Sequence, residues 1–263
     1  MASFRRLNDG PYRRSLESPK PFGPGRFVAE GWLVLERALA ARVPVEAILV
    51  ASARLARLDD LLDGRAVDVL VADGEVIEAI VGFDLHRGVV AVCERRRLPD
   101  VESLVQRSAR LLVVEGVSDT ENLGALFRNA AGLGADGIVV DTTSADPWSR
   151  RVVRTSMGHV LTVPWCRSPV GAAIDAAIAA GHHIVALTPA GDVELTDLEA
   201  SDRPTAVVVG AEGPGLTRDT LGRASVTVRI DMAHDVDSLN VATAAALGMR
   251  QAFGPAAARP DYS

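Results

Sequence analysis

Residues 115–140 read EGVSDTENLGALFRNAAGLGADGIVV, and the fold of this stretch decides what the chain can bind. Gly132, Gly134 and Gly137 spell G-x-G-x-x-G, the pattern of a dinucleotide-binding loop. That loop binds pyrophosphate only where it leaves a strand and opens a helix, because the free amide groups of the helix N-terminus face the ligand. Here the glycines follow a predicted helix and precede a predicted strand. This reversed order favours a helix C-cap and turn, and disfavours a nicotinamide oxidoreductase.

Strands and helices alternate on the N-terminal side of this stretch. Apolar residues at helical spacing predict a helix over 26–43. The alternation that follows ends near Glu94 and is typical of a small α/β domain, which we place at 21–94. We expect a flexible basic tail at 1–20 and a polar linker at 95–108. The strands of this domain are predicted at 45–52, 66–73 and 88–95, and its further helices at 53–62 and 74–82.

A second alternating series predicts another domain at 109–263. Several of its strands are continuous apolar runs, which is typical of a parallel sheet covered on both faces. Its strands are predicted at 109–117, 136–141, 182–188, 204–210 and 225–231, and its helices at 120–133, 147–158, 170–181 and 237–254.

Composition limits the class of protein. The chain has 263 residues, 48% of them hydrophobic, which is enough for one large or two ordinary domains. It has no run of about 18 apolar residues and no apolar segment behind its basic N-terminus, so we expect neither a membrane span nor a secretory signal. The two cysteines, Cys93 and Cys166, lack the spacing of metal ligands. We expect buried thiols in a cytoplasmic protein without a metal.

Charge alone disfavours a nucleic-acid partner, because the net charge is −6. The distribution of charge matters more than its sum. Arg150, Arg151 and Arg154 lie on one predicted helix and are either a solvated surface or contacts to RNA phosphates. Weaker candidates for RNA contact are the tail arginines Arg5, Arg6, Arg13 and Arg14.

His182 and His183 precede an apolar strand and are expected to be structural.

A second glycine-rich stretch, GAEGPGL at 210–216, does follow a predicted strand. It has no lysine and is therefore not a P-loop. Glu212 lies inside the turn, where its carboxylate would repel a pyrophosphate. The stretch therefore suits a neutral or cationic ligand such as S-adenosylmethionine, or is an ordinary corner between a strand and a helix.

Three stretches occur in order along the second domain: NLGALFR (122–128), GAEGPGL (210–216) and IDMAHDVDSLNVATAAA (230–246). Together they resemble the three motifs of the SpoU/TrmH family of RNA ribose 2'-O-methyltransferases, of the SPOUT class. The resemblance covers about 109–254, and the N-terminal part looks like the ribosomal-protein-like RNA-binding domain of many members. It implies an α/β fold with a parallel sheet and a C-terminal trefoil knot, preceded by a small α/β RNA-binding domain.

The third motif departs from the family pattern, which reads I-P-M-x-G before S-L-N-V-S. Asp231 replaces the proline, His234 the glycine and Ala242 the last serine, whereas Ser238 and Asn240 are retained. We expect Asp231 to alter the wall of the cofactor pocket and His234 to change the loop that faces RNA.

The resemblance implies an in-line displacement in which a ribose 2'-oxygen attacks the cofactor methyl group. It places Arg128 beside the attacking oxygen, as a cation that favours the developing alkoxide. A phosphate or Glu212 is then the proton relay, and Asn122, Ser238 and Asn240 complete the site. From the residues alone, Asn122 and Ser238 are equally candidates for helix N-caps.

The same resemblance assigns the cofactor, S-adenosylmethionine, largely to main-chain groups. These belong to Gly210, Ile230 and Leu239, while Leu187 and Met232 line the adenine pocket. It also implies a homodimer. We therefore expect a methyltransferase acting on 23S ribosomal RNA, with transfer RNA as the second candidate and a non-catalytic RNA-binding protein as the alternative of another class.

Overall fold

The computed structural model describes residues 4, 7, 9, 25–82, 88–233 and 237–254. These residues form two compact units. One unit takes in the described residues up to Arg97 together with Pro147–Thr162, and the other takes in Leu98–Asp146 and the described residues from Val163 onward. This division differs from the expected domains in residues 147–162, which pack with the first unit.

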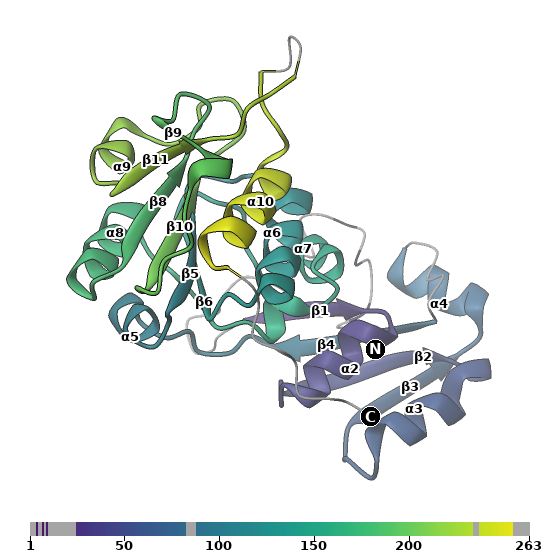
Figure 1. Cartoon of the computed structure of the whole chain (residues 1–263). Helices are drawn as coiled ribbons and strands as arrows, with labels where there is room; N and C mark the ends of the chain where they lie inside the picture. Colours follow the sequence, from purple (N-terminus) through teal and green to yellow (C-terminus); the bar gives the residue numbers. More distant parts are fainter. Residues whose placement is uncertain are drawn as a thin grey trace. The chain divides into compact units, whose positions relative to one another are not determined.

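The first unit is built on a four-stranded sheet (Figure 1). Its strands lie in the order β1-β4-β2-β3; the β2–β3 pair is parallel and the other pairs are antiparallel. The strands are β1 (Arg26–Glu30), β2 (Val45–Ala51), β3 (Asp68–Ala72) and β4 (Val89–Glu94). The helices are α2 (Trp32–Ala40), α3 (Leu55–Leu62), α4 (Gly74–Val81) and α7 (Arg150–Thr155).

The helix predicted over 26–43 is wrong in its first part, because residues 26–30 form β1. Gly31 has a φ of 93°, a conformation that favours glycine and separates the strand from α2. Strand β1 pairs with β4 and is buried along Phe27–Glu30, so Phe27, Val28 and Ala29 form a continuous apolar run without the alternation of a half-exposed strand. Periodicity cannot distinguish such a run from a helix.

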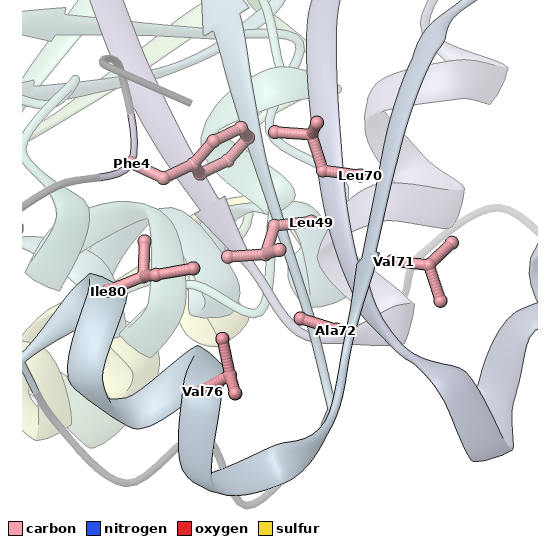
Figure 2. A pocket seen from close by; sticks show the side chains of 7 residues that line it. All are labelled: Phe4, Leu49, Leu70, Val71, Ala72, Val76 and Ile80. Atoms are coloured by element: carbon pink, nitrogen blue, oxygen red, sulfur yellow. The ribbon is translucent and has the colours of Figure 1, made fainter.

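Two residues of the expected flexible tail are anchored on this unit. Phe4 and Leu7 are fully buried and pack with Leu49 and Ile77. Phe4 also lines an apolar cavity of about 150 Å³ beside α4 (Figure 2). The tail arginines lie outside the described residues. The cavity is lined by Phe4, Leu49, Leu70, Val71, Ala72, Val76 and Ile80.

Helix α7 is attached to the first unit by an ion pair that is largely withdrawn from water. The Nε and Nη2 atoms of Arg150 donate to Oε2 of Glu30 at 2.9 and 2.7 Å. The side chains are only 13% and 10% exposed. Nearby, Trp148 stacks on Phe27 with ring centroids 5.0 Å apart, and Arg37 donates to the carbonyl oxygen of Met157.

The second unit contains a seven-stranded sheet in the order β7-β6-β5-β10-β8-β11-β9. All its strand pairs are parallel, which confirms the predicted sheet. The trefoil knot stays a prediction. The strands are β5 (Arg110–Val114), β6 (Gly137–Val140), β7 (Trp165–Arg167), β8 (His183–Leu187), β9 (Val193–Glu194), β10 (Thr205–Val209) and β11 (Val226–Arg229).

Helices cover both faces of this sheet (Figure 1). Helix α6 ends at Gly134, whose φ of 77° confirms it as the predicted cap, and Gly137 opens β6, so the dinucleotide interpretation is wrong. Helices α6 and α10 pack side by side on one face, and α5 and α8 pack together on the other. The helices are α5 (Val101–Gln106), α6 (Thr120–Leu133), α8 (Val170–Ala179), α9 (Arg218–Gly222) and α10 (Val241–Ala252).

Four short elements were not predicted. Helix α5 lies in the expected polar linker, where Asp100 accepts a hydrogen bond from the main-chain N–H of Ser103 at the start of the helix, while Leu104 and Val105 are buried. Strands β7 and β9 and helix α9 have two to five residues, which is too short for a periodic signal.

Of the expected structural residues, Cys93, Cys166 and His182 are buried and His183 is half-buried. Burial raises the pKa of both Cys93 and Cys166 to about 12, so neither thiol ionises near neutral pH. Nδ1 of His182 lies 3.2 Å from the carbonyl oxygen of Ala177, and its Nε2 lies 2.7 Å from the carbonyl oxygen of Ser108.

Within the described ranges, no helix is long and apolar enough to cross a membrane. No cluster of three or more His, Cys, Asp or Glu side chains in the same ranges is arranged to hold a metal ion.

The buried ion pair gives a first testable prediction. Replacing Glu30 with Gln should lower the free energy of unfolding by about 3 kcal/mol, because Arg150 keeps its charge in a site that water barely reaches. Urea unfolding followed by tryptophan fluorescence measures this, since Trp32 and Trp148 both lie in the first unit. The matched control is Glu36→Gln, which breaks the exposed Glu36–Arg57 pair and should cost less than about 1 kcal/mol. Equal small losses would show that the buried pair does not attach α7.

Candidate active site

The loops that follow β5, β10 and β11 leave the same edge of the sheet, because parallel strands end on one side. Helix α6 starts in the first of these loops. Asp119 is its N-cap and accepts hydrogen bonds from the main-chain N–H groups of Glu121 and Asn122, both at 2.8 Å. Asn122 is therefore not the cap. It lies in the first turn of α6, and its side chain is available for other contacts.

Three side chains from the three motif stretches meet in one hydrogen-bond network. Nδ2 of Asn122 donates to Oε1 of Glu212 at 2.7 Å. Nδ2 of Asn240 donates to Oδ1 of Asn122 at 2.7 Å and to Oε1 of Glu212 at 3.2 Å. These residues are 28 to 118 positions apart in the chain. The fold thus brings together the candidates that the sequence motifs selected separately.

The cap of α10 fixes the direction of this network. Oδ1 of Asn240 accepts from the main-chain N–H groups of Ala242 at 2.9 Å and Thr243 at 3.4 Å. Because a main-chain N–H can only donate, the amide nitrogen of Asn240 must face Asn122 and Glu212. Asn122 in turn presents its oxygen to Asn240 and its nitrogen to Glu212. The exposed Ser238 is not the cap of α10, contrary to one of the two expectations for it.

Glu212 lies at the tip of a tightly closed turn. Ala211 and Gly215 form an isolated β-bridge, and the N–H of Gly215 donates to the carbonyl of Ala211 at 3.0 Å. A side chain at Gly210 would come within 2.4 Å of the Gly215 main chain, so only glycine fits there. Behind the turn, both carboxylate oxygens of the buried Glu115 lie 3.4 Å from the N–H of Thr217.

Arg128 lies outside the network. It is exposed on α6 and forms no hydrogen bond or ion pair with any residue that the structure describes. It follows Asn122 by six residues, which in an α-helix is a separation of about 120° around the axis and about 9 Å along it. The two side chains therefore point to different sides of α6. Nothing in the network orients Arg128 through Asn122.

The candidate cofactor residues follow the adjacent strands β8, β10 and β11. Leu187 ends β8 and packs on Gly248, where an added Cβ would lie 2.5 Å from a Leu187 methyl group. Ile230, Met232 and Leu239 are half-buried. The main-chain groups of Ile230 and Leu239 form no hydrogen bond with the described residues. The roles of these residues toward the cofactor stay a prediction.

The departures at the third motif have different outcomes. Nε of Arg229 donates to Asp231 at 3.0 Å, and Nη1 donates to the carbonyls of Gly191 at 3.3 Å and Asp192 at 3.1 Å. Asp231 is thus paired at the surface next to Ile230. His234 lies outside the described residues.

The arginines predicted to contact RNA are not equivalent. Arg150 is held by Glu30 in the first unit. Arg154 lies 4.0 Å from the same carboxylate and its side chain is 43% exposed. Arg151 is exposed. A contact between Arg150 and a phosphate would compete with its ion pair, so Arg154 and Arg151 are the better placed candidates.

Sequence patterns missed three residues of the site: Asp119, Glu115 and Asn129. Asp119 precedes an apolar run as a cap does, and this signal could have identified it. Glu115 follows an apolar strand, but its burial depends on the turn behind it. Asn129 donates to the carbonyl of Ala242 at 2.8 Å across α6 and α10, a pairing that no local pattern predicts.

Comparison with known proteins agrees with this site. The sequence profile of the SpoU rRNA Methylase family matches residues 109–250, and that of the RNA 2'-O ribose methyltransferase substrate-binding domain matches 28–99. An uncharacterised tRNA/rRNA methyltransferase of Mycobacterium tuberculosis is 43% identical over 248 residues, which is 93% of this chain and 85% of that protein. A 23S rRNA (guanosine-2'-O-)-methyltransferase of a Burkholderia species is 32% identical over 70% of this chain and 76% of its own length.

Solved structures give the same relationship. The AdoMet-bound rRNA methyltransferase from Sinorhizobium meliloti superposes with a TM-score of 0.79 at 26% identity, over 95% of this chain and 92% of that one. The SpoU profile covers more than half of the chain, and its boundaries include all three motif stretches. The chain therefore belongs to the SpoU methylase family of RNA ribose 2'-O-methyltransferases.

Proposed function

We propose that the chain is a cytoplasmic, homodimeric methyltransferase that uses S-adenosylmethionine to methylate a ribose 2'-hydroxyl of 23S ribosomal RNA. The observation that carries this proposal is the network of Asn122, Glu212 and Asn240, one residue from each motif stretch. A relative named as a 23S rRNA enzyme supports the choice of substrate. The substrate-binding match at 28–99 supports the first unit as the RNA-binding module.

S-adenosylmethionine supplies an electrophilic methyl group with a neutral leaving group, so the protein has to align the ribose oxygen and stabilise its growing negative charge. The guanidinium of Arg128 is suited to the second task, because it stays protonated and is exposed without a partner among the described residues. Oε1 of Glu212 is held by two amide groups, while Oε2 accepts no hydrogen bond from the described residues. Oε2 is therefore the atom available to accept the hydroxyl proton.

A non-catalytic RNA-binding protein with the same fold is the competing function. Such a protein has no need of a polar network that converges on one carboxylate oxygen. Calorimetry with S-adenosylmethionine separates the two functions, because a protein that only binds RNA should not bind the cofactor. Transfer RNA and ribosomal RNA tested side by side in methyl transfer decide the substrate.

Arg128 provides the main catalytic prediction. Arg128→Ala should reduce methyl transfer to RNA at least 100-fold, because the developing alkoxide loses its cation. Its affinity for S-adenosylmethionine should stay within about threefold, since Leu187, Gly210 and Ile230 lie on other segments. Transfer of a radioactive methyl group and calorimetry measure the two effects.

Two further variants test the chemistry of Arg128. Arg128→Lys should also be slow, because a point charge does not reproduce the planar fork of donors. The matched control is Arg218→Ala, which removes an exposed arginine on α9 and should keep full activity. Unchanged turnover in Arg128→Ala would show that Arg128 has no part in the reaction.

Arg154 gives a prediction on RNA binding. If its exposed guanidinium neutralises a phosphate, Arg154→Ala should flatten the log–log dependence of RNA affinity on salt by about 0.7 to 0.9. Filter binding at several salt concentrations measures this slope. Arg65→Ala, which removes another exposed arginine of the first unit, should leave the slope unchanged. If the salt dependence of RNA affinity has the same slope in Arg154→Ala and Arg65→Ala, Arg154 does not contact a phosphate.

The homodimer is tested at α10. Leu247 is 42% exposed on that helix, whose start carries the third motif stretch. Leu247→Glu should convert a dimer into a monomer in light scattering after size exclusion, because it places a charge in an apolar contact. Ile178→Glu on α8, at a residue that is 49% exposed, should leave the dimer intact. A wild-type chain that is a monomer in light scattering would contradict the proposed homodimer.

A further inference from the structure

One side of α6 carries two asparagines. Asn122 and Asn129 are seven residues apart, which places them about 20° apart around the helix axis and two turns apart along it. Helix α10 packs along this side of α6 (Figure 1). Both asparagines therefore face the helix whose start carries the third motif stretch.

Asn129 contacts the main chain of α10. Its Nδ2 donates to the carbonyl oxygen of Ala242 at 2.8 Å, in a half-buried position. The amide orientation is unambiguous, because a carbonyl oxygen can only accept. Ala242 is a position where this chain departs from the family motif. The contact uses its main chain, so it is independent of the substituted side chain.

The two asparagines hold the first turn of α10 at two points. Asn122 accepts from the Asn240 side chain, which itself caps the helix through the N–H groups of Ala242 and Thr243. Asn129 holds the carbonyl of the same first turn. Each contact holds a different group of the turn, and α10 also packs along α6 and on β10 and β8. Together they fix both the position and the direction of the α10 N-terminus on α6.

We propose that Asn129 is a positioning residue of the methyltransferase, which keeps the segment before α10 in register with Arg128. This inference rests on the proposed function. Arg128 precedes Asn129 on α6, whereas Leu239 and Asn240 lead directly into α10. A displacement of about 1 Å between groups that must align in a reaction can cost about 100-fold in rate. The hydrogen bond of Asn129 prevents such a displacement.

The opposite end of α10 offers a matched control. Nε2 of Gln251 donates to the carbonyl oxygen of Leu198 at 2.7 Å. This is the same kind of bond, from a side-chain amide to a main-chain carbonyl, and it also fixes α10 in the second unit. A purely structural role for Asn129 predicts that losing either bond has the same consequence.

The test compares Asn129→Ala, Asn129→Asp and Gln251→Ala in the full-length protein. Asn129→Asp keeps the size of the side chain but turns the donor toward Ala242 into an acceptor. Both Asn129 variants should lower kcat for RNA methylation by 10-fold or more, with KM for RNA and the Kd of S-adenosylmethionine within about threefold. Gln251→Ala should keep kcat, while its melting temperature falls about as much as that of Asn129→Ala.

Hydrogen exchange of residues 238–246 in the wild type and the variants gives a readout that needs no RNA substrate. Faster exchange there in Asn129→Ala, but not in Gln251→Ala, is expected. Equal kcat in Asn129→Ala and Gln251→Ala, or unchanged exchange, would overturn the inference. A wild-type chain that transfers no methyl group to any RNA would instead overturn the proposed function, and exchange would still decide whether Asn129 fixes α10.

Discussion

The N-cap of α10 is the interaction on which the site depends. Two main-chain N–H groups need an acceptor, and Oδ1 of Asn240 is that acceptor. This requirement determines which way the Asn240 amide faces, then which way the Asn122 amide faces, so that both amide nitrogens donate to Glu212. A helix end that must be satisfied for stability therefore also sets the polarity of the candidate active site.

Much of the second unit could be predicted from the sequence, because its apolar strands and its α6 boundaries carry strong local signals. The helix expected over 120–133 matches α6, and the resemblance to the three family motifs selected Asn122, Glu212 and Asn240, which meet in space. Local signals failed where a residue's role depends on partners distant in the chain. Ser238 and Asn122 have the chemistry of caps, but Asn240 and Asp119 occupy those positions. Strand β1 looked helical, because its pairing with β4 and its complete burial lie outside any local window.

The site also explains which departures from the family motif a chain can accept. Ala242 contributes its N–H and carbonyl to the network, and any residue except proline supplies those groups. Asp231 is exposed and paired with Arg229, which at the same time holds the carbonyls of Gly191 and Asp192. A change from a rigid proline to a charged residue is thus accompanied by an ion pair that ties the same segment to its neighbour. Where main chain makes the contacts, side chains are free to vary.

The discontinuous first unit has a consequence for biosynthesis. Its last segment, Pro147–Thr162, starts about 50 residues after Arg97 (147 − 97), which at ordinary rates of translation is a delay of roughly 3 to 10 s. During that delay Glu30 has no Arg150 and Phe27 has no Trp148, so a carboxylate and an aromatic ring of the unit wait without their partners. By the time Arg150 and Trp148 are synthesised, β5, α6 and β6 have already left the ribosome's active centre. The nascent chain therefore cannot finish its first unit before starting its second, and a chaperone that shields the incomplete first unit would act in this interval.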